Sequence, residues 1–179
     1  MNNRFLRFSS LFLIMLVAGI LNYGCRQAPK VTFSGAIPPE GAETFSVENF
    51  FNDANDGPAN LEIRFSEALR EYFQRNTPLT PVTFNGDIQL SGSISRYELR
   101  PVSAGAGETQ GAQLQRLTIG VKYDYIVLTE EDKNLENATA SQFQDFPADQ
   151  NLSDVEDGLI EEIFEQIIFD IYNRTLADW

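Results

Sequence analysis

Apolar and polar residues alternate along the chain with two different periods. Between positions 61 and 76, apolar residues return every four positions, which predicts an amphipathic helix. A longer segment with helical spacing, 152–179, predicts a second helix. Between 114 and 128, every second residue is apolar, which predicts a strand with one buried and one polar face. The chain therefore combines helices with at least one long strand.

Turn-forming residues divide the rest of the chain into shorter segments. Strands are expected near 31–35 and 43–49, and a weaker strand is expected at 139–146. The stretch 52–60 is rich in Asn and Asp and predicts a loop that leads into the first helix. The Gly- and Ala-rich stretch 103–113 predicts the loop of a hairpin between two strands.

The segment 87–102 carries a strand pattern whose phase changes midway. Its apolar residues occupy one face as far as Ile94 and then continue from Tyr97, which belongs to the other phase. A β-bulge inserts one extra residue and thereby returns a strand to its original face. We therefore expect a bulge near Ser95 or Arg96.

The C-terminal helix carries the strongest helical signal. Ser153 and Glu156 have the spacing of a capping box, which predicts the start of the helix. Ile163 and Ile167 lie in the middle of its apolar stripe, so we expect both in the core. The acidic residues on the other side are interpreted as a solvated face rather than as catalytic groups: Glu161, Glu162 and Glu165.

The order of these elements predicts the fold class. Hairpin-type connections between the later strands favour an antiparallel sheet, and two helices with matching apolar stripes can cover one of its faces. We therefore expect an α+β domain. Its architecture would be a two-layer sandwich, with a mainly antiparallel sheet of four to five strands and two helices packed on one face.

The N-terminus has the pattern of a secretory signal. Two arginines precede the apolar stretch 11–21, which is too short to span a bilayer comfortably. The only cysteine, Cys25, directly follows Gly24, as in a bacterial lipobox. We therefore interpret residues 1–24 as a lipoprotein signal peptide. A plain secreted protein or a short transmembrane anchor is the alternative.

Acylation of Cys25 would explain the position of this single thiol. Each buried CH₂ group of an acyl chain contributes about 0.8 kcal/mol, so two or three chains make attachment effectively permanent. Residues 25–30 would then form a lipidated tether, and residues 31–179 the folded domain. These boundaries predict a protein that is held at a membrane by lipid.

The amino-acid composition of the chain excludes or disfavours several classes of function. The formal net charge is −13, which disfavours nucleic acid as a partner because phosphate binding needs clustered cations. The chain contains no histidine and one cysteine, so His-dependent catalysis and the usual zinc sites are excluded. No phosphate-binding glycine motif is present. We therefore expect no metal, no cofactor and no catalytic residues.

Several segments in a fixed order resemble one family. They are FSGAIPPEGAETFSVENFFN, FSEALREYF, GDIQLSGSISRYELRPV, RLTIGVKYDY and QNLSDVEDGLIEEIFEQIIFDIYNRTLADW, which follow the lipobox-like cysteine. Together they resemble the LptE family, the outer-membrane lipoproteins of lipopolysaccharide assembly. The resemblance covers nearly all of residues 31–179 and depends on the order and spacing of these segments rather than on one motif.

The resemblance implies a function without catalysis. LptE proteins sit inside a large β-barrel, LptD, as a plug and folding partner, and the two insert lipopolysaccharide into the outer leaflet. The implied location is the periplasmic side of the outer membrane, through a lipid anchor. The lipid handled would be lipopolysaccharide or a shorter lipid A-based glycolipid. The implied family fold, two helices on a four-stranded sheet, agrees with the element order deduced above.

Some members of this family contact lipopolysaccharide through basic side chains near a strand loop. Four cations in the central strand segments are the candidates in this chain: Arg96, Arg100, Arg116 and Lys122. No motif aligns them with the ligand contacts of the family, so they enter as candidates by position alone. The competing hypothesis is a free-standing periplasmic lipoprotein that binds a small ligand or an envelope component. A hydrolase is disfavoured by the missing histidine.

Overall fold

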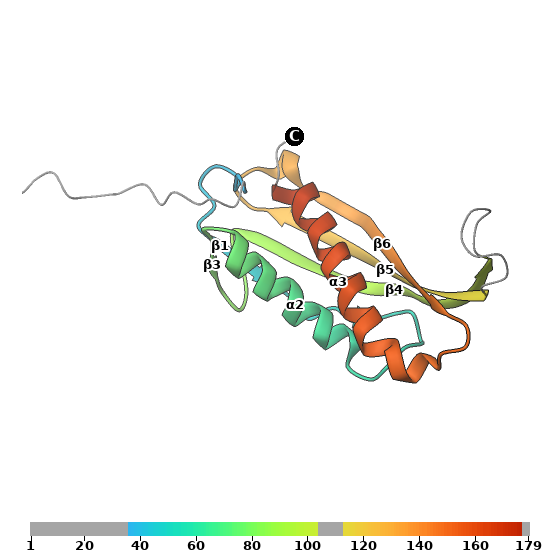
Figure 1. Ribbon diagram of the computed structural model, residues 1–179. Coiled ribbons are helices and arrows are strands. Elements are labelled where there is room, and N and C mark those ends of the chain that lie inside the picture. The colour runs from blue at the N-terminus through green and yellow to red at the C-terminus, as the bar shows by residue number, and fades with distance from the viewer. Residues whose placement is uncertain (1–35, 104–112, 177–179) are drawn as a thin grey trace, which may run out of the picture. The chain divides into compact units, whose positions relative to one another are not determined.

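One mixed sheet carries two helices on the same face in the computed structural model (Figure 1). The structure describes residues 36–103 and 113–176, all of which belong to the compact unit Thr32–Trp179. Its strands are β1 (Thr44–Val47), β2 (Phe51–Asn52), β3 (Thr80–Pro81), β4 (Ile88–Ser103), β5 (Gln113–Val127) and β6 (Leu135–Pro147). Its helices are α2 (Leu61–Asn76) and α3 (Leu152–Leu176), and a short 3-10 turn, η1 (Glu131–Lys133), precedes β6.

The sheet joins three long antiparallel strands to three short parallel ones. The strand order is β3-β1-β4-β5-β6, and β2 pairs with β4 beyond the end of β1. Strand β5 runs antiparallel to β4 and to β6, whereas β1 and β2 run parallel to β4, and β3 runs parallel to β1. The predicted α+β fold with two helices on one face is confirmed.

The strand count and part of the pairing differ from the expectation. The described residues form six strands rather than four to five, and three pairings are parallel. The reason is the position of α2, which lies in sequence between β1 and β4. A helix between two strands returns the chain in its original direction, so the flanking strands become parallel neighbours.

The predicted bulge is present at the expected position. The register between β4 and β5 shifts between Ile94 and Arg96, so Ser95 is the extra residue. Beyond the shift, Tyr97 pairs with Ile119, which is fully buried. The bulge therefore restores the core face of β4 and directs Arg96 to the opposite face.

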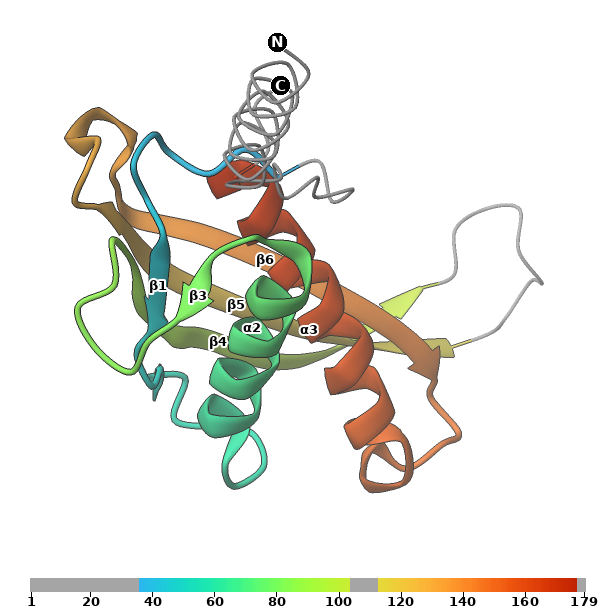
Figure 2. The ribbon, with the colours of Figure 1, turned by 90° about the vertical axis from the view of Figure 1, so that its left-hand side faces the viewer.

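Both helices lie on one face of the sheet (Figure 2), and the apolar stripes predicted for them are buried. α2 packs on β1, β2 and β3, and α3 packs on β5 and β6. Phe65 of α2 and Phe164 of α3 meet edge to face with ring centroids 5.1 Å apart, which joins the two helices. Fully buried residues of the helices include Leu61, Phe65, Leu69, Phe73, Ile160, Ile163, Ile167 and Ile171.

The predicted capping box at the start of α3 is wrong. The helix begins at Leu152, so Ser153 already lies in its first turn. The Glu156 carboxylate instead accepts a hydrogen bond from the Tyr97 hydroxyl. Burial, followed by this hydrogen bond, raises the pKa of Tyr97, so the hydroxyl remains a donor. Glu156 therefore ties the start of α3 to β4.

Some sequence-based predictions lie outside the described residues. They are the signal peptide 1–24, the tether 25–30 with Cys25, the strand near 31–35 and most of the hairpin loop 103–113. The loop 52–60 is described, and it leads into α2 as expected.

Gly92 in β4 leaves no room for a side chain against β5, which makes it a test of the packing. A Cβ atom at this position would lie 2.2 Å from the Lys122 carbonyl oxygen and 2.8 Å from the Tyr123 Cα. We expect Gly92→Ala to cost about 1–3 kcal/mol in unfolding free energy, because backbone atoms of β5 must move. Thermal unfolding followed by circular dichroism measures this loss.

Gly158 in α3 is the matched control, because a Cβ atom there meets nothing within 4 Å. Gly158→Ala should stabilise the protein by about 0.5–1 kcal/mol, since glycine is costly inside a helix. Equal melting temperatures for the two alanine variants would contradict the packing of β4 on β5 described here.

Candidate functional site

The face of the sheet that carries no helix is polar. Side chains alternate between the two faces of a strand. On β4, β5 and β6, the residues that alternate with the buried ones therefore point away from the helices. We call this surface the open sheet face. Its residues include Ser91, Ser93, Arg96, Glu98, Arg100, Arg116, Thr118, Lys122, Thr139, Ser141, Phe143 and Asp145.

All four candidate cations lie on the open sheet face. Arg100 pairs directly with Arg116 across β4 and β5, and Arg96 pairs with Gly120 on the same ladder. Lys122 lies between Ser93 of β4 and Thr139 of β6. At about 3.3 Å per residue, the cations extend along roughly 20 Å of the strands. The structure therefore brings them into one line rather than into one pocket.

Arg116 is held by two neighbours on β6. Its Nε atom lies 2.7 Å from Asp145 Oδ1, and a terminal nitrogen lies 2.8 Å from Oδ2, which makes the pair bidentate. The guanidinium also lies over the Phe143 ring, 3.7 Å from its centroid. The hydrogen bonds from Arg116 lower the pKa of the Asp145 carboxyl. Arg116 is therefore a fixed and largely neutralised cation.

The other three cations differ in how far their charge is neutralised. Arg100 forms an ion pair with Glu98 at 2.6 Å, which offsets the repulsion expected between Arg100 and Arg116 across the ladder. Arg96 and Lys122 form no ion pair with any other described residue. Both side chains are exposed. They are the cations on this face that can accept an anionic group without first losing a partner.

Sequence reasoning missed two residues of this face. Phe143 and Asp145 were assigned to a weak strand, with no role beside Arg116. Their alternate spacing placed both on one face of that strand, which was the available signal. The register with β5, which sequence alone does not supply, places them beside Arg116. Phe143 is 45% exposed, so an aromatic surface remains next to the cation.

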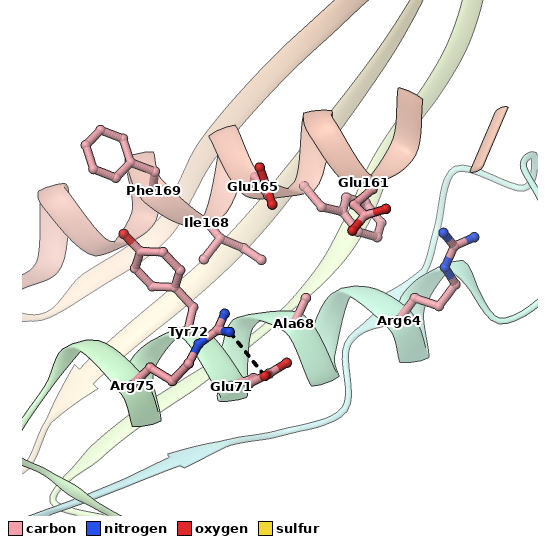
Figure 3. A pocket seen from close by; sticks show the side chains of 10 residues that line it. Arg64, Ala68, Glu71, Tyr72, Arg75, Glu161, Glu165, Ile168 and Phe169 are labelled. Carbon is pink, nitrogen blue, oxygen red and sulfur yellow. Dashed lines mark ion pairs between the residues drawn. The ribbon is translucent and has the colours of Figure 1, made fainter. Parts of the chain in front are cut away.

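A groove lies between α2 and α3, and its volume is about 790 Å³ (Figure 3). Its apolar lining comes from Ala68 and Tyr72 of α2 and from Phe164, Ile168 and Phe169 of α3. Its charged lining residues are Arg64, Glu71, Arg75, Glu161 and Glu165. The acidic residues of α3 are exposed, as the sequence predicted, but two of them border this groove.

The described residues contain neither a helix suited to cross a membrane nor a cluster of candidate metal ligands. Over 36–103 and 113–176, no helix is both long and apolar enough to cross a membrane. In the same two ranges, no group of three or more acidic, Cys or His residues is placed to hold a metal ion.

Solved structures with a similar fold come from several bacteria. An uncharacterized lipoprotein B from Nitrosomonas europaea has a TM-score of 0.55 at 14% identity, over 86% of this chain and 92% of that one. A hypothetical protein from Chlamydia trachomatis has a TM-score of 0.50 at 8% identity, over 77% of this chain and all of that one. A putative neuraminyllactose-binding hemagglutinin homolog from Helicobacter pylori also has a TM-score of 0.50, at 6% identity, over 82% of this chain and 88% of that one. At these identities the likeness concerns the fold.

The family comparison is more specific. No curated protein matches this chain. The family model described as "LptE: Lipopolysaccharide-assembly" matches residues 42–175. That range includes every strand and nearly all of both helices, and it confirms the resemblance of the sequence segments to this family. The chain therefore belongs to the LptE family of lipopolysaccharide-assembly proteins.

Proposed function

We propose that this protein is a lipid-anchored plug of an LptD-like β-barrel and that the pair places lipopolysaccharide in the outer membrane. The family match over residues 42–175 carries the proposal. In this proposal the protein catalyses nothing. It supports the barrel and offers a surface to the lipid as the lipid passes.

The open sheet face has the chemistry that a barrel interior requires. Lumens of outer-membrane barrels are polar and contain water. The helix-free side of this sheet presents serines, threonines and charged groups, and its large exposed apolar side chains include Phe143 and Phe51, which pairs with Ser93. A domain with such a surface can sit in a wet channel without burying unpaired polar groups.

The lipid anchor supports the same arrangement. Acylation of Cys25 would confine the domain to the membrane that contains the barrel. Tethering of this kind raises the effective concentration of a partner, so a modest interface can give a stable complex. Residues 25–30 would form the tether between the anchor and the domain, as predicted from the sequence.

Arg96 and Lys122 are the proposed contacts to lipid phosphates. They lack ion-pair partners among the described residues, and charge-assisted hydrogen bonds to phosphate are about twice as strong as neutral ones. Arg100 and Arg116 would have to break their ion pairs with Glu98 and Asp145 before they could bind a phosphate. In this proposal they contribute positive charge beside the binding residues.

We expect Arg96→Ala/Lys122→Ala to weaken binding of purified lipopolysaccharide by roughly tenfold or more, since a hydrogen bond to a charged group contributes about 1.5–3 kcal/mol. The control is Arg75→Ala/Lys133→Ala, which removes two exposed cations from other surfaces. Fluorescence anisotropy with labelled lipid measures both variants. Equal affinities for the wild type and the Arg96/Lys122 double variant would exclude these two residues as lipid contacts.

The partnership with a barrel predicts how the protein behaves when it is produced alone. Expressed without the barrel, the chain should be poorly soluble or should need detergent. Co-expression with the barrel from the same bacterium should yield one complex in detergent. A free-standing ligand-binding lipoprotein would instead remain monomeric and well behaved in both cases.

A further inference from the structure

The α2–α3 groove has a mostly buried apolar floor and an exposed apolar border. Ala68 and Ile168 lie between the two helices, and Phe169 is 52% exposed at the α3 border (Figure 3). The Tyr72 ring, partly buried, contacts the Tyr172 ring edge to face, with centroids 5.3 Å apart. The groove therefore combines exposed apolar surface with aromatic rings that are already fixed in place.

The two walls of the groove differ in charge. On the α2 side, Arg64 forms an ion pair with Asp157 at 2.8 Å, and Arg75 forms one with Glu71 at 3.3 Å. On the α3 side, Glu161 and Glu165 form no ion pair with any described residue. The basic wall is thus neutralised by the protein itself, and the acidic wall is not. The groove carries a net negative charge.

The charge and the apolar lining of the groove indicate which kind of molecule it can bind. Five of the ten lining residues are charged, which disfavours a purely apolar small molecule. Anionic lipid would be repelled by the two unpaired carboxylates. A groove between two helices suits an amphipathic segment whose apolar side chains enter it. Basic side chains on that segment could reach Glu161 and Glu165, and their alkyl stems could cover Phe169.

We propose that the α2–α3 groove is a docking site for a basic, amphipathic segment of a partner protein. One apolar side chain of that segment lies on Ala68 and Tyr72, which are partly exposed, and its Lys or Arg residues pair with Glu161 and Glu165. The site lies on the helical side of the sheet, away from the cations of the open sheet face (Figure 2). It is therefore independent of lipid binding and does not require the partner to be a barrel.

A second copy of the chain fits this groove poorly. Four of the described cations gather on the open sheet face, among serines and threonines. Arg100 and Arg116 on that surface are already paired with carboxylates. The surface lacks the row of apolar side chains needed to fill a groove between helices. A partner of different sequence is the better occupant.

A synthetic Leu/Lys amphipathic helix is a suitable probe for the full chain in mild detergent. Wild-type protein should bind the labelled peptide in fluorescence anisotropy, and Glu161→Gln/Glu165→Gln should weaken the affinity at least fivefold. The matched control, Glu131→Gln/Glu162→Gln, removes the same charge outside the groove and should change affinity less than twofold. A peptide with Ser in place of each Lys should not bind.

Photo-crosslinking locates the bound peptide. A benzoylphenylalanine at Phe169 should crosslink to the peptide, and one at Phe143 on the open sheet face should not. Equal weakening by both glutamine double variants would show general attraction to an acidic protein and would overturn the proposal. So would crosslinking from Phe143 alone, or a dimer of this chain that crosslinks through Phe169 in place of the peptide.

Discussion

Replacing Ile163 by aspartate should unfold the domain. Ile163 is fully buried in the middle of α3, within the cluster that joins both helices to the sheet. An unpaired carboxylate at this position would have to lose its hydration, which costs several kcal/mol. Because a domain is stabilised by only about 5–15 kcal/mol, that cost removes much or all of its stability. Circular dichroism against temperature measures the loss.

Gln166→Asp on the same helix is the control. Gln166 is exposed, so its replacement should change the unfolding free energy by no more than about 0.5 kcal/mol. The two variants add the same charge to α3 and differ only in the face on which they add it. A melting temperature for Ile163→Asp within a few degrees of the wild type would show that α3 does not pack through this face.

Replacing Cys25 by alanine should abolish acylation of the protein. Cys25 is the only cysteine in the chain, so no other thiol can receive the lipid. Without acyl chains the protein loses the burial of every CH₂ group, each of which contributes about 0.8 kcal/mol. Mass spectrometry of the membrane and soluble fractions should show an acylated wild type and a variant without lipid.

Lys30→Ala is the matched control, because it changes the expected tether but leaves the thiol. It should remain acylated and in the membrane fraction. Wild-type protein that is cleaved, unmodified and found in the soluble fraction would contradict lipidation at Cys25. The family assignment would then stand without the anchor.

Long elements with one buried face could be predicted from the sequence because periodicity reports burial directly. The stripe of α2 and the alternation in β5 required only the spacing of apolar residues. The bulge at Ser95 was predictable for the same reason, since a change of phase within a strand requires an extra residue.

Two of the three short parallel strands could not be predicted in this way, whereas β1 matches the strand expected near 43–49. β2 and β3 contain two residues each, which is too short for any period to be detected. Their place in the sheet depends on hydrogen bonds to β4 and β1, which are distant in sequence. The capping box failed for a related reason. Glu156 forms its hydrogen bond with Tyr97, a tertiary partner that local spacing does not reveal.

The candidate site was predictable in its residue types but not in its arrangement. The sequence placed cations in two neighbouring strands, yet only the register shows that Arg100 faces Arg116. The neutralisation of Arg116 by Asp145 requires a third strand. The α2–α3 groove requires the packing of two helices that are separated by four strands in the sequence.

Native purification tests the central claim most directly. The claim is that this LptE-family protein is held in the outer membrane as the plug of a β-barrel. The protein should be tagged at its C-terminus at its natural expression level, extracted in mild detergent and analysed by native mass spectrometry. We expect one equimolar complex of an acylated chain with a large β-barrel protein. A monomer without lipid and without a barrel partner would contradict the claim.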